Sequence, residues 1–290
     1  MINTSLQEMQ KTYLNVKTGS PDSVQKPNSA MEENMKRHMG ILIVLALCAI
    51  PGQAIAIGVE AAVGGWYQTP EVSVAYKPLA SAVNEIDIDD EANYDEETGV
   101  LARIKVDMPL LLPNIYVMAT PMEFEGRGRK SQDFKFGDDI FTANVDFDSR
   151  VVLDHYDVAL FWGVPLLETA TFDKLNAEFG INVRIINLEA EVVQPATGLS
   201  ERTDETLGVP MLYLGAQLFP IEKFGIEVEG RGIAYSDNHF YDLIGRLKLK
   251  MLGPVFVAGG WRYEDVKIDE DDVKAELTFS GPFLEAGFSF

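Results

Sequence analysis

The side chains most able to do chemistry fall in one short stretch. Ser236, Asp237 and His239 lie within four positions of each other. An imidazole that takes the proton of a serine hydroxyl is the central feature of many acyl hydrolases. Ser-Asp-Asn is also ordinary turn chemistry, because these side chains hydrogen-bond to nearby backbone. The stretch therefore predicts a hairpin turn, and hydrolysis at His239 is only a distant alternative.

The other histidine beyond residue 56 is His155, which has Asp154 and Asp157 close by in the sequence. These side chains could bind a metal ion, but a polar position on the inside of a strand explains them equally well. The sequence contains no glycine-rich phosphate loop and no paired histidine ligand spacing. We therefore predict no catalytic, cofactor-binding or metal-binding residues.

Ten segments of alternating apolar and polar residues predict ten β-strands, because successive side chains of a strand point to opposite faces. The clearest is 225–235, in which Ile226 and Val228 share one face and Glu227 lies on the other. No segment shows a convincing helical period. The predicted strands are 57–67, 99–108, 114–125, 150–162, 177–193, 209–219, 224–235, 240–252, 254–266 and 272–290.

The connections between these segments alternate in kind. One set is apolar, contains proline and is mostly tight, while the other set is polar or acidic and mostly longer. Short turns on one side, longer loops on the other and an even strand number are typical of outer-membrane barrels. The short set is 108–113, 163–167, 219–223 and 252–254, and the long set is 68–98, 126–149, 194–208, 236–239 and 267–271.

The segment 272–290 breaks the alternation once. Its odd positions are apolar from Val273 to Phe279, whereas its even positions are apolar from Leu284 to Phe290. A change of phase at Gly281-Pro282 indicates either a bulge in one long strand or a tight turn between two short ones. A turn would give an odd number of strands, so we expect the bulge.

The polar faces of the predicted strands carry nearly balanced charge, although the formal net charge of the chain is −21. A face open to water needs no such balance, whereas an unpaired ion inside a narrow barrel is costly. We therefore expect the polar faces to line a lumen. They hold Arg103, Lys105, Asp107, Asp157, Glu178, Arg184, Glu227, Glu229, Arg231, Arg246, Lys248, Lys250, Arg262 and Glu264.

Aromatic residues gather near the ends of the predicted strands, as two girdles at the membrane interfaces would place them. A secreted β-sandwich or lipocalin-like barrel with a wet exterior is the alternative to a membrane barrel. The predicted girdle residues are Trp66, Tyr67, Tyr156, Trp162, Phe219, Tyr235, Tyr241, Trp261 and Tyr263.

Residues 35–56 have the three parts of a secretory signal peptide. A basic start leads into the apolar run 39–50, and Ala54-Ile55-Ala56 has the form of a cleavage site. We predict cleavage after Ala56, with residues 1–34 an over-called start or a disordered extension. The one cysteine, Cys48, lies in the apolar run, and Leu47 before it argues against a lipoprotein signal.

Cleavage would leave a strongly acidic chain. Residues 1–56 carry five of the 24 basic and four of the 45 acidic residues, so 19 and 41 remain and the net charge is −22. Such a chain repels nucleic acid. The acidic runs 85–97, 133–148 and 264–272 could share divalent cations with lipopolysaccharide phosphates, but they lack the spacing of a calcium loop. We expect solvated loops.

Residues 57–290 resemble the small outer-membrane β-barrel proteins of Gram-negative bacteria. The resemblance rests on the signal peptide, the turn asymmetry and the apolar face that ends in Phe288-Ser289-Phe290. It implies an all-β, transmembrane, antiparallel up-and-down barrel of about ten strands, with roughly eight to twelve possible. It also implies a monomer in the cell outer membrane with lipid and lipopolysaccharide as neighbours.

The same resemblance implies that barrel-assembly machinery recognises Phe288 and Phe290. Changing both to serine should impair insertion far more than Glu285→Ala. Small barrels of this class act as structural proteins, adhesins, narrow channels or lipid-modifying enzymes, so the resemblance does not select a function.

A barrel of this size has a lumen that side chains can fill. Glu227 and Glu229 are expected to face three bases on the next strand, Arg246, Lys248 and Lys250. We therefore predict a non-enzymatic barrel with a charge-filled lumen and a structural or surface-interaction role. A narrow channel selective for ions or small solutes is the alternative.

Overall fold

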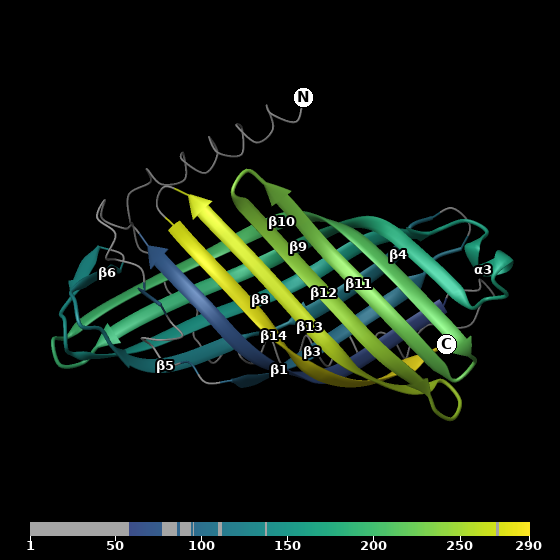
Figure 1. The fold of residues 1–290 in the computed structure, drawn as a ribbon, viewed down its shortest axis with the longest axis horizontal. Coiled ribbons are helices and arrows are strands. Elements are labelled where there is room, and N and C mark those ends of the chain that lie inside the picture. The colour runs from purple at the N-terminus through teal and green to yellow at the C-terminus, as the bar shows by residue number, and fades with distance from the viewer. Residues whose placement is uncertain are drawn as a thin grey trace, which may run out of the picture. The chain divides into compact units, whose positions relative to one another are not determined.

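The chain forms a closed antiparallel barrel of ten strands, as predicted (Figure 1). The computed structural model describes residues 58–76, 86–87, 94, 96–109, 112–136, 138–270 and 273–290. The predicted signal peptide 35–56, residues 1–34 and most of the acidic run 85–97 lie outside the described residues. No helix among the described residues is long and apolar enough to cross a membrane.

Each of the ten predicted segments coincides with one strand of the wall, and β14 pairs with β1 to close the barrel. Apart from the wall, β2 (Ile86–Asp87) pairs with β1, β6 (Phe134–Phe136) pairs with β7 (Asp139–Phe141), and α3 (Leu167–Ala170) is a short helix. The wall consists of β1 (Gly58–Tyr76), β3 (Glu97–Asp107), β4 (Asn114–Thr120) continued by β5 (Glu123–Arg129), β8 (Asp146–Gly163), β9 (Leu175–Gln194), β10 (Leu199–Ile221), β11 (Phe224–Tyr235), β12 (Asn238–Lys250), β13 (Val255–Glu270) and β14 (Val273–Ser289).

The two faces of each strand differ in the way that a membrane barrel requires. On β9, Ile181, Val183 and Ile185 point outward and are exposed, while Asn182 and Arg184 between them are buried in the lumen. The same alternation on the other wall strands produces an outward apolar band. In a closed barrel every backbone group of the band is paired within the sheet, so the band can face lipid.

Several strands are much longer than a bilayer needs. A tilted strand of about 9–11 residues crosses the membrane, but β1 has 19 residues, β8 has 18, β9 has 20 and β10 has 23. Their extra length lies at the end of the barrel where β6 lies, which is on the left in Figure 1 and which we call the upper end. The end with α3 and Phe290, on the right in Figure 1, is the lower end. The predicted loops 126–149 and 194–208 are therefore largely strand.

The outward side chains show where the membrane band stops. Above Ile185 on β9 the outward face becomes polar, and Glu189 binds Arg150 of β8 at 2.8 Å and Arg202 of β10 at 2.7 Å. Charged groups in this position are compatible with water and not with lipid tails. The sequence alternation did not reveal these extensions, because their outward faces are charged and loop-like in composition.

The strand β14 is continuous, and the predicted bulge at Gly281-Pro282 is wrong. Its register with β13 runs without a shift through Arg262↔Gly281 and Trp261↔Pro282. The odd positions face the lumen along the described part of the strand, including Leu277 and Glu285. The apparent change of phase arises because the lumen itself changes from apolar in its upper part to charged in its lower part.

The upper lumen is filled by apolar side chains, which we call the upper apolar cluster. Its rings stack closely, with Phe124 5.3 Å from Phe279 and Phe134 5.1 Å from Phe141 between centroids. Such packing excludes water as the core of a soluble domain does. The cluster consists of Phe124, Phe134, Phe141, Phe147, Val151 and Phe279, all buried.

The predicted aromatic girdles are partly confirmed. Tyr67, Trp162, Tyr241, Trp261 and Tyr263 are exposed on the outward face. The assignment of Trp66 to a girdle is wrong, because its side chain is fully buried in the lumen. Its indole N–H donates to the Gly281 carbonyl at 3.2 Å, and the Arg262 guanidinium lies 4.6 Å from its ring centroid.

Candidate functional site

The middle and lower lumen contains a network of charged side chains that is almost neutral as a whole. Ionised groups in such a place are tolerated only if they are paired and hydrogen-bonded. Seven basic residues, Arg103, Lys105, Arg184, Arg231, Arg246, Lys248 and Arg262, meet eight acidic ones, Glu60, Asp157, Glu178, Glu227, Glu229, Asp242, Glu264 and Glu285.

The middle ion cluster is built around Arg184 of β9 and Arg262 of β13. Arg184 donates to both oxygens of Asp157 at 2.8 Å, and it also binds Asp242 and Glu264. Arg262 donates to both oxygens of Asp242 at 3.0 Å and to Glu264 Oε1 at 2.6 Å. Bidentate pairs of this kind are strong and directional, so they fix both arginines in place.

The lower ion cluster joins β1, β3, β11, β12 and β14. Arg103 donates to Glu285 at 2.7 Å and binds Glu60 at 2.8 Å. Glu60 also binds Lys248, at 2.5 Å, and Lys248 donates to Glu227 at 2.9 Å. The contacts therefore cross the seam where β14 closes onto β1.

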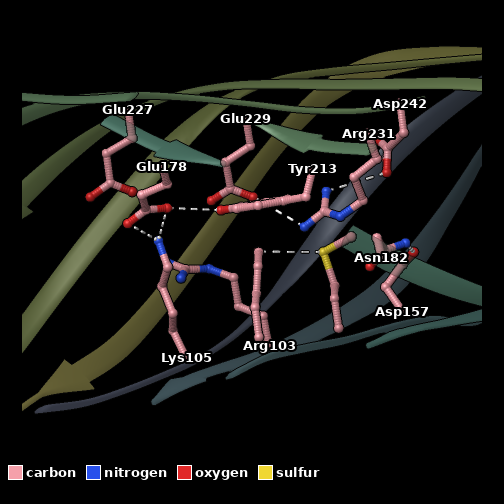
Figure 2. Close-up of polar contacts among 12 residues, drawn as sticks. Arg103, Lys105, Asp157, Glu178, Asn182, Tyr213, Glu227, Glu229, Arg231 and Asp242 are labelled. Atoms are coloured by element: carbon pink, nitrogen blue, oxygen red, sulfur yellow. Dashed lines mark hydrogen bonds and ion pairs between the residues drawn. The ribbon is translucent and has the colours of Figure 1, made fainter. Parts of the chain in front are cut away.

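A second part of the lower cluster reaches from β3, which is next to β1, to β9 and β10 on the far side of the lumen. Lys105 donates to the two oxygens of Glu178 at 2.9 and 2.7 Å, and Tyr213 donates to Glu178 at 3.0 Å (Figure 2). Arg231 connects this part to the middle cluster. Its guanidinium lies 5.4 Å from the Tyr213 ring centroid, donates to Glu229 at 3.2 Å, and lies 3.5 Å from Asp242 Oδ2 of the middle cluster.

Many of these contacts bridge the lumen instead of running along one wall. Arg262 on β13 lies 3.3 Å from His155 Nε2 on β8, and these strands are five steps apart in either direction round the barrel. Arg184 on β9 reaches Glu264 four strands away at 2.8 Å. Such contacts place charged groups across the centre of the lumen, where a solute would have to pass.

Most of the predicted lumen residues are where the alternation placed them. The exceptions are Asp107 and Lys250, which are exposed near the lower end of the barrel. Three acids that complete the network are absent from the predicted set of lumen charges: Glu60, Asp242 and Glu285. The position of each in the alternation of its strand could have identified it. Glu285→Ala is therefore no neutral control, because it would leave Arg103 without its principal partner.

His155 occupies an interior strand position, which was one of its two readings. Its side chain is fully buried, its Nδ1 lies 3.1 Å from the Leu153 carbonyl, and its Nε2 lies 3.2 Å from Glu264 Oε1. Its closest described acid is thus Glu264, and neither Asp154 nor Asp157. His155 therefore belongs to the ion network.

His239 is placed at the upper end by the tight turn between β11 and β12. Ser236 and Asp237 form that turn, because Tyr235 pairs with Asn238. The imidazole stacks on Tyr241 at 4.9 Å, and its Nε2 lies 3.2 Å from Asp265 Oδ2 on β13. The described contacts of His239 are thus with neighbouring strands, which gives the hydrolase alternative no support.

A closed antiparallel barrel with an outward apolar band and a charged lumen is an outer-membrane β-barrel protein, and its location is the outer membrane. Neither a protein family nor a curated protein sequence matches the chain.

Several solved structures are similar to it in fold. The outer membrane protease OmpT of Escherichia coli is 10% identical, with a TM-score of 0.48 over 82% of this chain and 99% of that one. The translocator domain of the autotransporter NalP of Neisseria meningitidis is 11% identical, with a TM-score of 0.40 over 90% and 98%. Ail, the attachment invasion locus protein of Yersinia pestis, is 12% identical, with a TM-score of 0.33 over 81% and 100%.

Proposed function

We propose that this protein is a non-enzymatic, non-conducting barrel that presents its upper strands at the cell surface. The observation that supports this role most directly is the ion network, whose members contact one another across the lumen. Above the ion network, the upper apolar cluster fills the lumen with apolar side chains. An ion crossing the lumen would have to displace paired charges in the network and then lose its hydration shell in the apolar cluster.

Conductance in planar lipid bilayers tests the closed lumen. We expect no stable unit conductance from refolded protein whose heat-modifiable gel mobility shows that the barrel has formed. A general porin inserted in the same bilayer serves as the positive control. Stable unit conductance in the nanosiemens range would overturn the proposal and favour the narrow channel.

The surface role rests on the upper ends of β5, β8, β9 and β10. Their outward faces carry an ion-paired surface in which Arg150 binds Glu123 at 2.5 Å and Glu189 at 2.8 Å. Short turns and both ends of a barrel chain normally face the periplasm, so this surface faces outward from the cell. We propose that it contacts lipopolysaccharide sugars or other surface molecules, with the barrel as a monomeric anchor.

Cysteine labelling tests this orientation cleanly, because the chain has no cysteine beyond residue 56. Thr206→Cys lies on the upper part of β10, and Glu222→Cys lies in the turn between β10 and β11. A membrane-impermeant maleimide added to intact cells should label the first variant and not the second. The reverse pattern would show that the barrel is inserted the other way round.

The absence of enzyme activity is part of the same proposal. Ester and lipid hydrolysis should be indistinguishable between the wild type and His239→Ala. Activity that is present in the wild type and lost in the variant would make the protein a hydrolase.

A further inference from the structure

Between β5 and β8 the chain makes an excursion that the barrel wall does not need. The two strands already pair at Arg129↔Asp146, so residues 130–145 start and finish side by side. The excursion folds back on itself, since the Asn144 N–H donates to the Lys130 carbonyl at 2.7 Å. Inside it, β6 and β7 form a small hairpin separate from the wall.

This hairpin has one aromatic face, which is buried in the upper apolar cluster. Phe134 and Phe141 are cross-strand partners, stack 5.1 Å apart, and are 1% and 0% exposed. Phe134 also packs 5.2 Å from Phe147 of β8. The opposite face is in water, with Ile140 57% exposed. The excursion is therefore amphipathic, with its apolar face against the lumen.

The hairpin crosses the upper mouth of the barrel. β7 lies against β10, and β6 lies against β1. These two wall strands are five steps apart in either direction, so they are on opposite sides of a ten-stranded barrel. A segment that touches both must span the lumen between them.

Two side chains of the wall hold the excursion in place. Glu201 of β10 accepts from the Asp138 N–H at 3.0 Å, and Gln194 makes more contacts. Gln194, at the end of β9, is fully buried and accepts from the Thr142 N–H at 3.1 Å. Its own amide donates to the carbonyls of Thr142 at 2.9 Å and Val145 at 3.3 Å. Thr197 donates to the Gln194 oxygen at 3.0 Å and so orients the amide. Gln194 thus makes three hydrogen bonds to the excursion, whereas Glu201 accepts one.

We propose that residues 130–136 and 138–145 form a releasable cap over the upper lumen and that Gln194 is its latch. The cap lies across the mouth, and its apolar face closes the chamber. Its chain is continuous with the wall only at the ends of the neighbouring strands β5 and β8, and its other contacts with the wall are non-covalent. The latch consists of part-buried hydrogen bonds to backbone. Losing it removes the partner of the Thr142 N–H and of the Thr142 and Val145 carbonyls in the closed state, whereas water pairs the same groups in the open state. Opening the cap would expose the inner apolar faces of β8 and β9.

Accessibility of a cysteine beneath the cap tests the latch. Val192→Cys is a small change at a lumen-facing site of β9 that is 4% exposed. In refolded protein we expect slow labelling by a water-soluble maleimide, and adding Gln194→Ala should speed it about tenfold, since unpaired buried groups shift a local opening equilibrium by that order. Heat-modifiable gel mobility confirms that each variant is folded.

Two further variants keep the test decisive. Asp133→Ala removes the carboxylate that accepts from the Ala143 N–H at 2.7 Å, so it loosens the cap without touching the wall and should also speed labelling. Thr206→Ala removes a comparable exposed hydrogen bond to Asn187 on the same β9–β10 hairpin and should leave the rate unchanged. Equal labelling rates in all folded variants, or equal acceleration by Thr206→Ala, would overturn the latch. The conductance measurement tests whether the ion network below the cap closes the lumen, and the labelling measurement tests the cap. The proposed function and the cap can therefore be refuted independently.

Discussion

Each charged side chain in the lumen is expensive alone and tolerable only with its partners. Arg103 and Glu285 are both nearly inaccessible, and their contact of 2.7 Å joins β3 to β14 across β1. A buried pair of this kind contributes little compared with well-packed apolar residues, but breaking it leaves an uncompensated charge. Each ion of the network therefore depends on its partner. Replacing one member of a pair should lower the free energy of unfolding far more than replacing both.

For this pair we predict that Glu285→Ala lowers the free energy of unfolding by about 3–5 kcal/mol. The buried Arg103 charge would then keep only Glu60, which it shares with Lys248. Replacing both residues together, as Arg103→Met with Glu285→Leu, should recover most of the loss. Unfolding in urea from lipid vesicles, followed by tryptophan fluorescence, measures both values.

The matched control is an ion pair on the surface. Arg127 and Asp148 lie 3.7 Å apart with exposed side chains, so Asp148→Ala should cost no more than about 1 kcal/mol. If the double replacement lowers the free energy of unfolding as much as Glu285→Ala does, the loss of stability comes from packing and not from the unpaired charge of Arg103.

At the level of single strands, close backbone approach explains a residue that the alternation alone misread. Gly281 faces the lumen, and a Cβ there would lie 1.8 Å from the Tyr67 carbonyl oxygen of β1. The neighbouring Pro282 has no N–H to donate, and the paired positions between β1 and β14 skip from Trp66↔Phe283 to Thr69↔Ser280. Gly281-Pro282 is thus a site of close strand contact within a regular strand.

We predict that Gly281→Ala impairs closure of the β1–β14 seam, because the backbone must move to admit the methyl group. The folded fraction should fall, as measured by heat-modifiable gel mobility after refolding into detergent micelles. Gly245→Ala on β12 is the control, since a Cβ there meets nothing within 4 Å. Equal folding of the two variants would show that the seam adapts without cost.

Assembly gives a second prediction for β14. Phe288 and Phe290 are exposed on the outward face and stack 6.5 Å apart, which leaves both rings available to assembly machinery. Changing both to serine should reduce the amount of barrel in the outer membrane several-fold in cells. Refolding in vitro, where no machinery is present, should be affected much less.

Leu247→Ser with Leu249→Ser provides the matched control for that prediction. Both leucines are exposed on the outward face of β12, so the pair loses similar lipid-facing area away from β14. If membrane levels fall equally for the two double variants, the loss reflects lipid contact, and the two phenylalanines are not a recognition feature.

For the molecule as a whole, the sequence predicted the barrel because period-two alternation and turn length are local properties. It predicted the lumen charges of β11 and β12 for the same reason. It did not predict that Trp66 lies inside, because an aromatic near a strand end fits either face. The ends of the long strands and the β6–β7 hairpin were also hidden, since their positions depend on contacts such as Gln194 with Thr142 that are distant in sequence.

The position of the membrane along the barrel is the remaining property of the whole molecule. On β10, Leu214 points outward in the middle of the apolar band and is 60% exposed, whereas Thr206 points outward on the same strand above the band. Leu214→Arg should cost about 2–4 kcal/mol of unfolding free energy in vesicles, and Thr206→Arg no more than about 1 kcal/mol, because the cost of a lipid-facing charge falls steeply from the midplane to the interface. Both values come from urea unfolding in the same lipid. Equal costs would mean that the upper part of β10 is also within the bilayer, and the surface of ion pairs on β8 and β9 could not then face water.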